Sequence, residues 1–212
     1  MPEKWKNGAS DKARPVISDE EFAGRVQKAQ ALMREQGVDI LLAYGNEAEP
    51  QFQRYFSDYW PSFESAGVMM AADGEPVLLI GPESMTFAAD RSRIRDIRRL
   101  AAFRESSNPE YPGHVMDTFA DVIGDLTRGK APKRLAIAGY NLVPHYLYEE
   151  LKASLETFPG IGIVRGDELV MKLRMVKSPA EIECLRHAGR ITARAMDHVI
   201  ENIRPGMTEL EV

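Results

Sequence analysis

The stretches Ala66-Gly-Val-Met-Met-Ala-Ala72, Asp73-Gly74 and Pro76-Val-Leu-Leu-Ile80 decide the fold class of this sequence. Two apolar runs joined by Asp-Gly are typical of a β-hairpin, because this pair accepts the positive φ that a tight turn requires. The apolar run at 38–44 predicts a strand covered on both faces. Residues 134–139 and 161–165 predict two more strands, and another is expected to end near Phe103.

Helices are predicted between these strands. The first begins with a capping box at Ser18-Asp-Glu-Glu21 and ends at Gly37, which suits a left-handed C-terminal position. Shorter helices are predicted after Pro82, over 118–127 and over 144–155. Strands that alternate with helices, interrupted by one hairpin, predict an α/β domain with a mixed sheet flanked by helices. The apolar side of the first helix recurs at helical spacing through Phe22, Val26, Ala29 and Met33.

The chain is predicted to have four parts. Residues 1–17 are a polar, flexible lead-in, 18–170 are the α/β domain, 171–178 are a linker, and 179–212 begin a second domain. Ser178-Pro-Ala-Glu181 combines an N-cap serine, proline at the first helical position and glutamate three residues after the cap. The helix that starts there is expected to run to about Ile203 with one broad apolar side.

Composition bounds the function classes. A formal net charge of −5 over 212 residues argues against nucleic acid and anionic membranes as partners. The arginine run between Arg91 and Arg104 is interpreted as the solvated side of a strand and its loops, because no aromatic residues interleave with it. Cys184 is the only cysteine, which excludes an intrachain disulfide, and no apolar run approaches 18 residues. The expected location is the cytoplasm.

Two segments carry a family resemblance: Lys172-Leu-Arg-Met-Val-Lys-Ser-Pro-Ala-Glu-Ile182 and Ile203-Arg-Pro-Gly-Met-Thr-Glu-Leu-Glu-Val212. They resemble the junction between the two domains of the prolidase, aminopeptidase P and creatinase family, and the likeness extends over about residues 18–212. The resemblance implies a ribonuclease-H-like N-terminal domain followed by the first helix of a pita-bread catalytic domain. The sequence departs from the family at 53–60, where relatives often carry N-x-x-Y-L-T-G-F.

The resemblance also implies chemistry for the intact protein. Relatives hold two divalent ions (Mn, Co or Zn) through two Asp, one His and two Glu residues, and the metals generate a hydroxide that attacks an amide or amidine. All of these ligands would follow Val212, so the sequence predicts no catalytic residue and no metal site in this chain. A homodimer acting on a peptide or small-molecule substrate is expected of the full-length protein.

The residues here that could hold a metal are scattered. His187 and His198 stand eleven residues apart on one predicted helix, too far for one ion to bridge. Asp117, Asp121 and Asp125 recur every four residues, a pattern typical of a solvated helix face. His114 and His145 each stand alone in sequence, and glycines 160, 162 and 166 are wrongly placed around a strand for a dinucleotide fingerprint.

The aromatic cluster at 52–63 is the strongest candidate for a functional role. Core or subunit packing explains most of it, but the resemblance suggests that this region approaches the partner's active-site mouth, and the hypothesis is that Tyr59 or Trp60 lines the substrate entrance. The leading interpretation is a non-catalytic part of an Xaa-Pro dipeptidase or aminopeptidase P, serving dimerisation and substrate gating. Alternatives are a creatinase-like hydrolase of small nitrogenous compounds and a metal-free protein-binding module, so whether the chain belongs to an enzyme stays open at this point.

Overall fold

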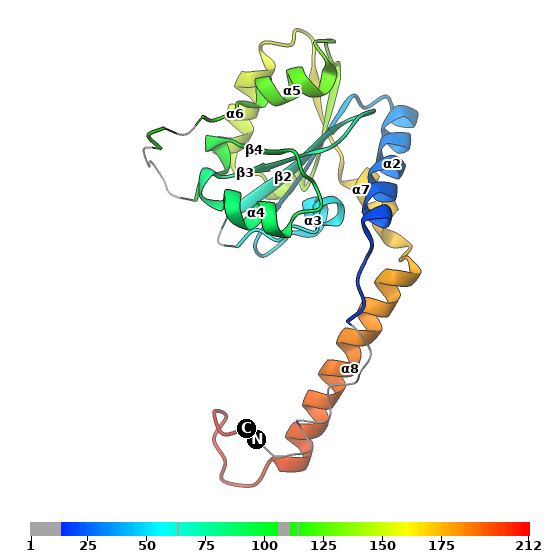
Figure 1. The fold of residues 1–212 in the computed structure, drawn as a ribbon, viewed down its shortest axis with the longest axis vertical. Coiled ribbons are helices and arrows are strands. Elements are labelled where there is room, and N and C mark those ends of the chain that lie inside the picture. The colour runs from blue at the N-terminus through cyan, green and yellow to red at the C-terminus, as the bar shows by residue number, and fades with distance from the viewer. Residues whose placement is uncertain (1–13, 63, 106–110, 114) are drawn as a thin grey trace. The chain divides into compact units, whose positions relative to one another are not determined.

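A computed structural model describes residues 14–62, 64–105, 111–113 and 115–212. The described residues form two compact units, one spanning Asp19–Val176 and the other combining residues 14–18 with Lys177–Val212. The larger unit contains one sheet with helices on both faces (Figure 1). The predicted lead-in at 1–17 falls almost entirely outside the described residues.

The sheet of the larger unit has six strands in the order β4-β3-β2-β1-β5-β6. Strand β2 is antiparallel to its neighbours β1 and β3, whereas the pairs β3–β4, β1–β5 and β5–β6 are parallel. This arrangement confirms the predicted mixed α/β sheet. The strand bounds are β1 Ile40–Asn46, β2 Ser65–Ala71, β3 Val77–Ile80, β4 Ile97–Arg99, β5 Arg134–Ala138 and β6 Gly162–Arg165.

The predicted hairpin is confirmed, but its connection is wider than a two-residue turn. The last paired residues of β2 and β3 are Met69 and Val77, and Gly74 takes the positive φ of 84° that was expected near the turn. The strand expected to end near Phe103 stops at Arg99, because residues 101–103 coil into a 3-10 turn that places Phe103 in the core.

Each face of the sheet is covered by its own set of helices. Side chains alternate along β1, so that Leu41 and Ala43 enter one core while Leu42 and Tyr44 enter the other. The first core is closed by α2 (Asp19–Gln36), α3 (Gln51–Ser57), α4 (Met85–Arg91) and α7 (Asp167–Met175). The second core is closed by α5 (Phe119–Thr127) and α6 (His145–Leu155).

Two of these helices were not predicted. Helix α3 occupies the aromatic cluster, and α7 runs through the residues proposed as the end of the domain and the start of a linker. Leu169 and Val170 of α7 are buried in the first core, and the larger compact unit continues to Val176.

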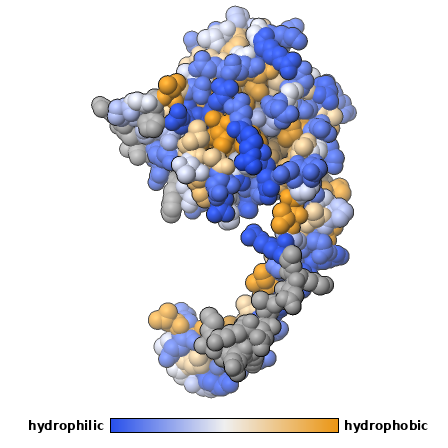
Figure 2. Space-filling view, in the orientation of Figure 1, coloured by the Kyte–Doolittle hydropathy of each residue, from blue (hydrophilic) through white to orange (hydrophobic). Residues whose placement is uncertain are grey.

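The smaller unit is dominated by α8 (Pro179–Asn202). Its predicted start is confirmed, since the Ser178 side chain accepts from the Glu181 amide while the Glu181 carboxylate accepts from the Ser178 amide. Apolar side chains lie at the surface of this helix (Figure 2), including Leu185 at 61% and Ile200 at 67% exposed. Among the described residues, no helix is both long and apolar enough to cross a membrane.

Candidate functional site at the carboxyl edge of the sheet

The strand directions gather five strand ends at one edge of the sheet. Strands β1, β3, β4, β5 and β6 all point the same way, since β1 and β3 are each antiparallel to β2 and the remaining pairs are parallel. Their carboxyl ends therefore share one edge, where β2 begins at Ser65. Ligands of open α/β sheets bind at this kind of edge, and the carboxyl edge is accordingly the candidate site.

Trp60 is a large aromatic side chain that the connection between α3 and β2 exposes at this edge. It is 50% exposed. Its indole N–H donates a 2.8 Å hydrogen bond to the Glu47 carbonyl, and the Arg54 guanidinium lies 4.7 Å from its ring centre. The ring is thus held at its N–H edge by Glu47 and over the ring by Arg54, while half of the side chain stays exposed.

A buried polar network fixes the backbone that carries Trp60. The Gln53 side chain is fully buried, and its amide donates a 2.9 Å hydrogen bond to the Tyr59 carbonyl. The Ser57 hydroxyl donates a 2.9 Å hydrogen bond to Gln53 Oε1. The same hydroxyl accepts a hydrogen bond from the Tyr59 backbone N–H. Asp58 between them takes a left-handed φ of 57°. Because these buried groups satisfy one another, the turn after α3 has one defined conformation.

Tyr59 and Glu64 form a buried pair beneath this turn. The Tyr59 hydroxyl donates a 2.7 Å hydrogen bond to Glu64 Oε1. Burial raises the pKa of Glu64, with the negative charges of Glu83 and Glu105 adding to the effect, while the Ser84 and Tyr59 hydroxyls oppose it. Burial also raises the pKa of Tyr59, and the neighbouring carboxylate raises it further. Tyr59 therefore stays a neutral donor throughout the physiological range.

The two residues hypothesised to line a substrate entrance have different environments. Trp60 is exposed, whereas Tyr59 is fully buried and acts as the support of the turn. Phe52, Tyr55, Phe56 and Tyr59 follow the spacing i, i+3, i+4 and i+7, which is the helical signal that could have revealed α3. Phe52 and Phe56 belong to the core, as interpreted for most of the cluster, and Phe63 lies outside the described residues.

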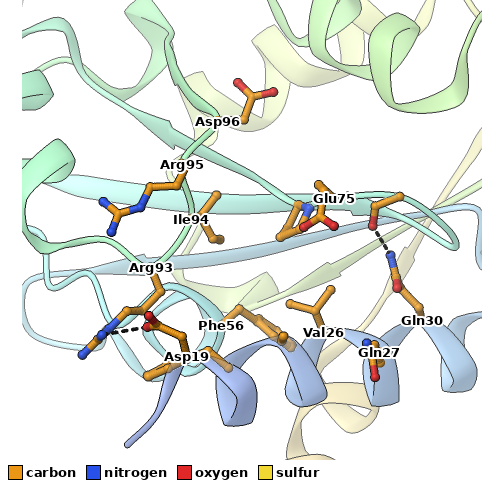
Figure 3. A pocket seen from close by; sticks show the side chains of 14 residues that line it. Asp19, Val26, Gln27, Gln30, Phe56, Glu75, Arg93, Ile94, Arg95 and Asp96 are labelled. Carbon is orange, nitrogen blue, oxygen red and sulfur yellow. Dashed lines mark hydrogen bonds and ion pairs between the residues drawn. The ribbon is translucent and has the colours of Figure 1, made fainter. Parts of the chain in front are cut away.

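A cavity of about 470 Å³ lies between α2 and the segment before β4. Figure 3 shows its polar ends: the Arg93 guanidinium pairs with Asp19 at one end, and the Gln30 amide donates to the Gly74 carbonyl at the other. Arg93 also pairs with Asp58 at 3.3 Å. Because these pairs already engage Arg93, its guanidinium is not available as an anion site in this cavity.

Arg98 links the basic run singled out in the sequence to two aspartates of the acidic run. Arg98 pairs with Asp96, Asp117 and Asp125 at 2.6, 3.5 and 3.1 Å, while Asp121 caps its own helix through Thr118. In the part of the chain that the structure describes, no group of three or more His, Cys, Asp or Glu side chains could hold a metal ion. The described residues therefore do not fit the two-metal centre that the resemblance implies. His114 lies outside them.

The chain is similar in sequence to known proteins. The chain is 27% identical over 196 residues to the ectoine hydrolase of Halomonas elongata, a match that covers 89% of this chain and 46% of that protein. The chain spans about half the length of the curated relatives it matches.

Solved structures share the fold. The prolidase from Pyrococcus horikoshii superposes with a TM-score of 0.61 at 20% identity, covering 89% of this chain and 45% of that one. The N-terminal domain of the cytoplasmic peptidase PepQ from Mycobacterium tuberculosis superposes with a TM-score of 0.51 at 19% identity, covering 71% of this chain and 98% of that one. A family model described as the Creatinase/Prolidase N-terminal domain matches residues 25–176. The chain therefore belongs to the creatinase/prolidase N-terminal domain family.

Proposed function

We propose that this chain is the N-terminal, non-catalytic part of a cytoplasmic hydrolase of the Xaa-Pro dipeptidase and aminopeptidase P type, and that it serves dimerisation and substrate gating. Membership in the family supports the first part, together with the match to about half of each curated relative. The two divalent ions (Mn, Co or Zn) of such an enzyme would be bound by a catalytic domain, since the described residues do not fit them.

The observation that supports the gating role is that the Trp60 ring is exposed and yet held in one position. A flexible exposed ring would lose conformational freedom on binding, whereas Trp60 is already held by Glu47 and Arg54. Tryptophan is enriched among the residues that dominate the binding energy of interfaces. Tyr59 contributes indirectly, because its hydrogen bond to Glu64 anchors the turn that presents the Trp60 ring.

Dimerisation is part of the proposal because gating requires that Trp60 reach the active site of a second protomer. A side chain of this domain reaches a substrate at the mouth of a neighbouring catalytic domain when two protomers associate. The complete gene product should therefore elute with twice the mass of one protomer in size-exclusion chromatography with light scattering.

The experiment that tests gating is Trp60→Ala in the complete gene product. We expect a raised KM or an altered side-chain preference across a panel of Xaa-Pro dipeptides, with little change in stability because half of the ring is exposed. Tyr146→Ala is the matched control, because Tyr146 is also 50% exposed but sits on α6. Trp60→Ala kinetics equal to those of wild type for every substrate would exclude the gating role.

A second candidate function is hydrolysis of a small nitrogenous compound. The match to a protein named ectoine hydrolase favours it. The family alone does not fix the substrate, because one fold serves several substrates. Assaying the complete gene product with ectoine beside Xaa-Pro dipeptides separates the two: turnover of ectoine alone would support this candidate and replace the dipeptidase assignment.

A further inference from the structure

Three oxygen atoms converge on Gly81, at the carboxyl end of β3. Measured from the point where a Cβ on residue 81 would stand, the Phe103 carbonyl oxygen is 2.5 Å away, Glu83 Oε2 is 2.8 Å away and Glu64 Oε2 is 3.1 Å away. Two of the three belong to carboxylates, and they come from segments that the fold brings together at the carboxyl edge.

Glycine is required here by these oxygens and not by the backbone. Gly81 has φ −68° and ψ 157°, a conformation that any residue adopts. A side chain would instead collide with the carbonyl of Phe103 and with both carboxylates. The missing Cβ therefore lets the three oxygens pack closely around one point beside the Cα of Gly81.

Each carboxylate accepts a tyrosine hydrogen bond through Oε1, and the Oε2 atom of each is the one that lies close to Gly81. The Tyr59 hydroxyl donates to Oε1 of Glu64, and the Tyr111 hydroxyl donates to Oε1 of Glu83. Glu64 is only 8% exposed, and its Oε2 is buried with no hydrogen-bond partner among the described residues. A buried carboxylate oxygen without a donor is costly unless something positive completes it.

We propose that Glu64, Glu83 and the Phe103 carbonyl bind a single hard divalent cation at Gly81. The ligands are all oxygens, which suits Mg²⁺ and Mn²⁺ rather than metals that prefer sulfur or imidazole. Mg²⁺ is commonly bound through one or two carboxylates and retains several waters, and the exposed side of Glu83 leaves room for them. The two tyrosines act as the outer hydrogen bonds that orient metal-binding carboxylates.

This site differs from a hydrolytic centre. It offers two carboxylates and one main-chain carbonyl, fewer groups than a pair of metals needs, and Glu64 Oε2 is closed to bulk solvent. Its role is to tie the start of β2 to the end of β3 and to the segment after β4. Neutralising the carboxylates would stabilise the edge that also carries Trp60.

The test is a titration of the 212-residue chain with Mn²⁺ at pH 8. Binding is measured by calorimetry and by the decrease of the free Mn²⁺ signal in electron paramagnetic resonance. We expect one ion per chain with a dissociation constant of about 1 mM or tighter, the range of weak oxygen-only sites. Mg²⁺ should compete for the same site.

Variants separate the site from general surface charge. Glu83→Gln and Glu64→Gln should each weaken binding about tenfold or more, a loss already seen when only an outer partner of a metal is removed. Gly81→Ala should abolish it. Glu75 is an exposed carboxylate in the β2–β3 connection, and Glu75→Gln should bind Mn²⁺ as the wild type does.

Glu83 is exposed, so Glu83→Gln leaves the core intact and keeps the test decisive even where Gly81→Ala does not fold. No saturable binding by the wild type up to about ten times that dissociation constant, or unchanged binding by both glutamine variants, would overturn the proposal.

Discussion

The Tyr59 hydroxyl donates a 2.7 Å hydrogen bond to the carboxylate of Glu64, and both side chains are buried where β2 begins. This contact joins the turn that presents Trp60 to the carboxylate that faces Gly81. The neutral phenol of Tyr59 and the buried acid of Glu64 therefore lie at the centre of the candidate site. The protonation of Glu64 is expected to affect both the turn that presents Trp60 and the oxygens around Gly81.

Glu64 should make stability depend on pH. Because the pKa of Glu64 is raised in the folded state, the native chain binds this proton more tightly than the unfolded chain. The stabilisation is fully present below the ordinary value of 4.5 and is lost as pH rises through the higher folded value. In urea denaturation with EDTA, Glu64→Gln should therefore gain stability relative to wild type between pH 5 and pH 8. Glu75→Gln should show no such trend, and parallel curves for Glu64→Gln and wild type would contradict the raised pKa.

Gln53 should be important for stability although it contacts no candidate ligand. Gln53→Ala removes the donor to the buried Tyr59 carbonyl, which is expected to cost about 1–3 kcal/mol. Chemical denaturation measures this cost, and the loosened turn should also shift Trp60 fluorescence. Gln51→Ala is the control: Gln51 is only partly buried and its amide donates to the exposed side chain of Glu49, so we expect a change within about 0.5 kcal/mol. Equal effects of the two substitutions would show that the network does not stabilise the turn.

Two glycines separate backbone strain from a close contact. Gly139 and Gly129 have similar φ values of 81° and 75°, but a Cβ on Gly139 would lie 2.6 Å from the Tyr44 carbonyl oxygen, whereas Gly129 faces open space. Gly129→Ala should cost roughly 1–2 kcal/mol, the penalty for a left-handed residue with a side chain. Gly139→Ala should cost distinctly more in the same thermal or urea unfolding experiment. Similar losses would mean that β1 and the end of β5 move apart at little cost.

Much of the fold could be predicted from the sequence because its signals are local. The Asp-Gly pair between apolar runs predicted the hairpin, and the Ser178 capping box predicted the start of α8 to the residue. Helices α3 and α7 were missed for different reasons. The aromatic spacing in α3 is a helical signal. Helix α7 follows directly on a strand and a single glycine, and the acidic pair Asp167-Glu168 in its first turn is the signal that could have marked its start.

The candidate site could be predicted only in part. Trp60 stood out as an aromatic residue, but its exposure and the burial of Tyr59 beside it depend on Gln53 and Ser57, which look unremarkable in sequence. The expectation of no metal site rested on the resemblance, which places the metal ligands after Val212, and on the scattered histidine and aspartate side chains. The close approach of three oxygens at Gly81 depends on a main-chain carbonyl and on a missing Cβ, and neither has a sequence signal.

The central claim, that hydrolysis is performed outside this chain, is tested most directly by assaying the purified 212-residue chain with Mn²⁺ or Co²⁺ against Xaa-Pro dipeptides and ectoine. We expect no turnover above a blank that contains the metal alone, even where Mn²⁺ binds. Cleavage that increases in proportion to the concentration of the chain and is abolished by EDTA would contradict it.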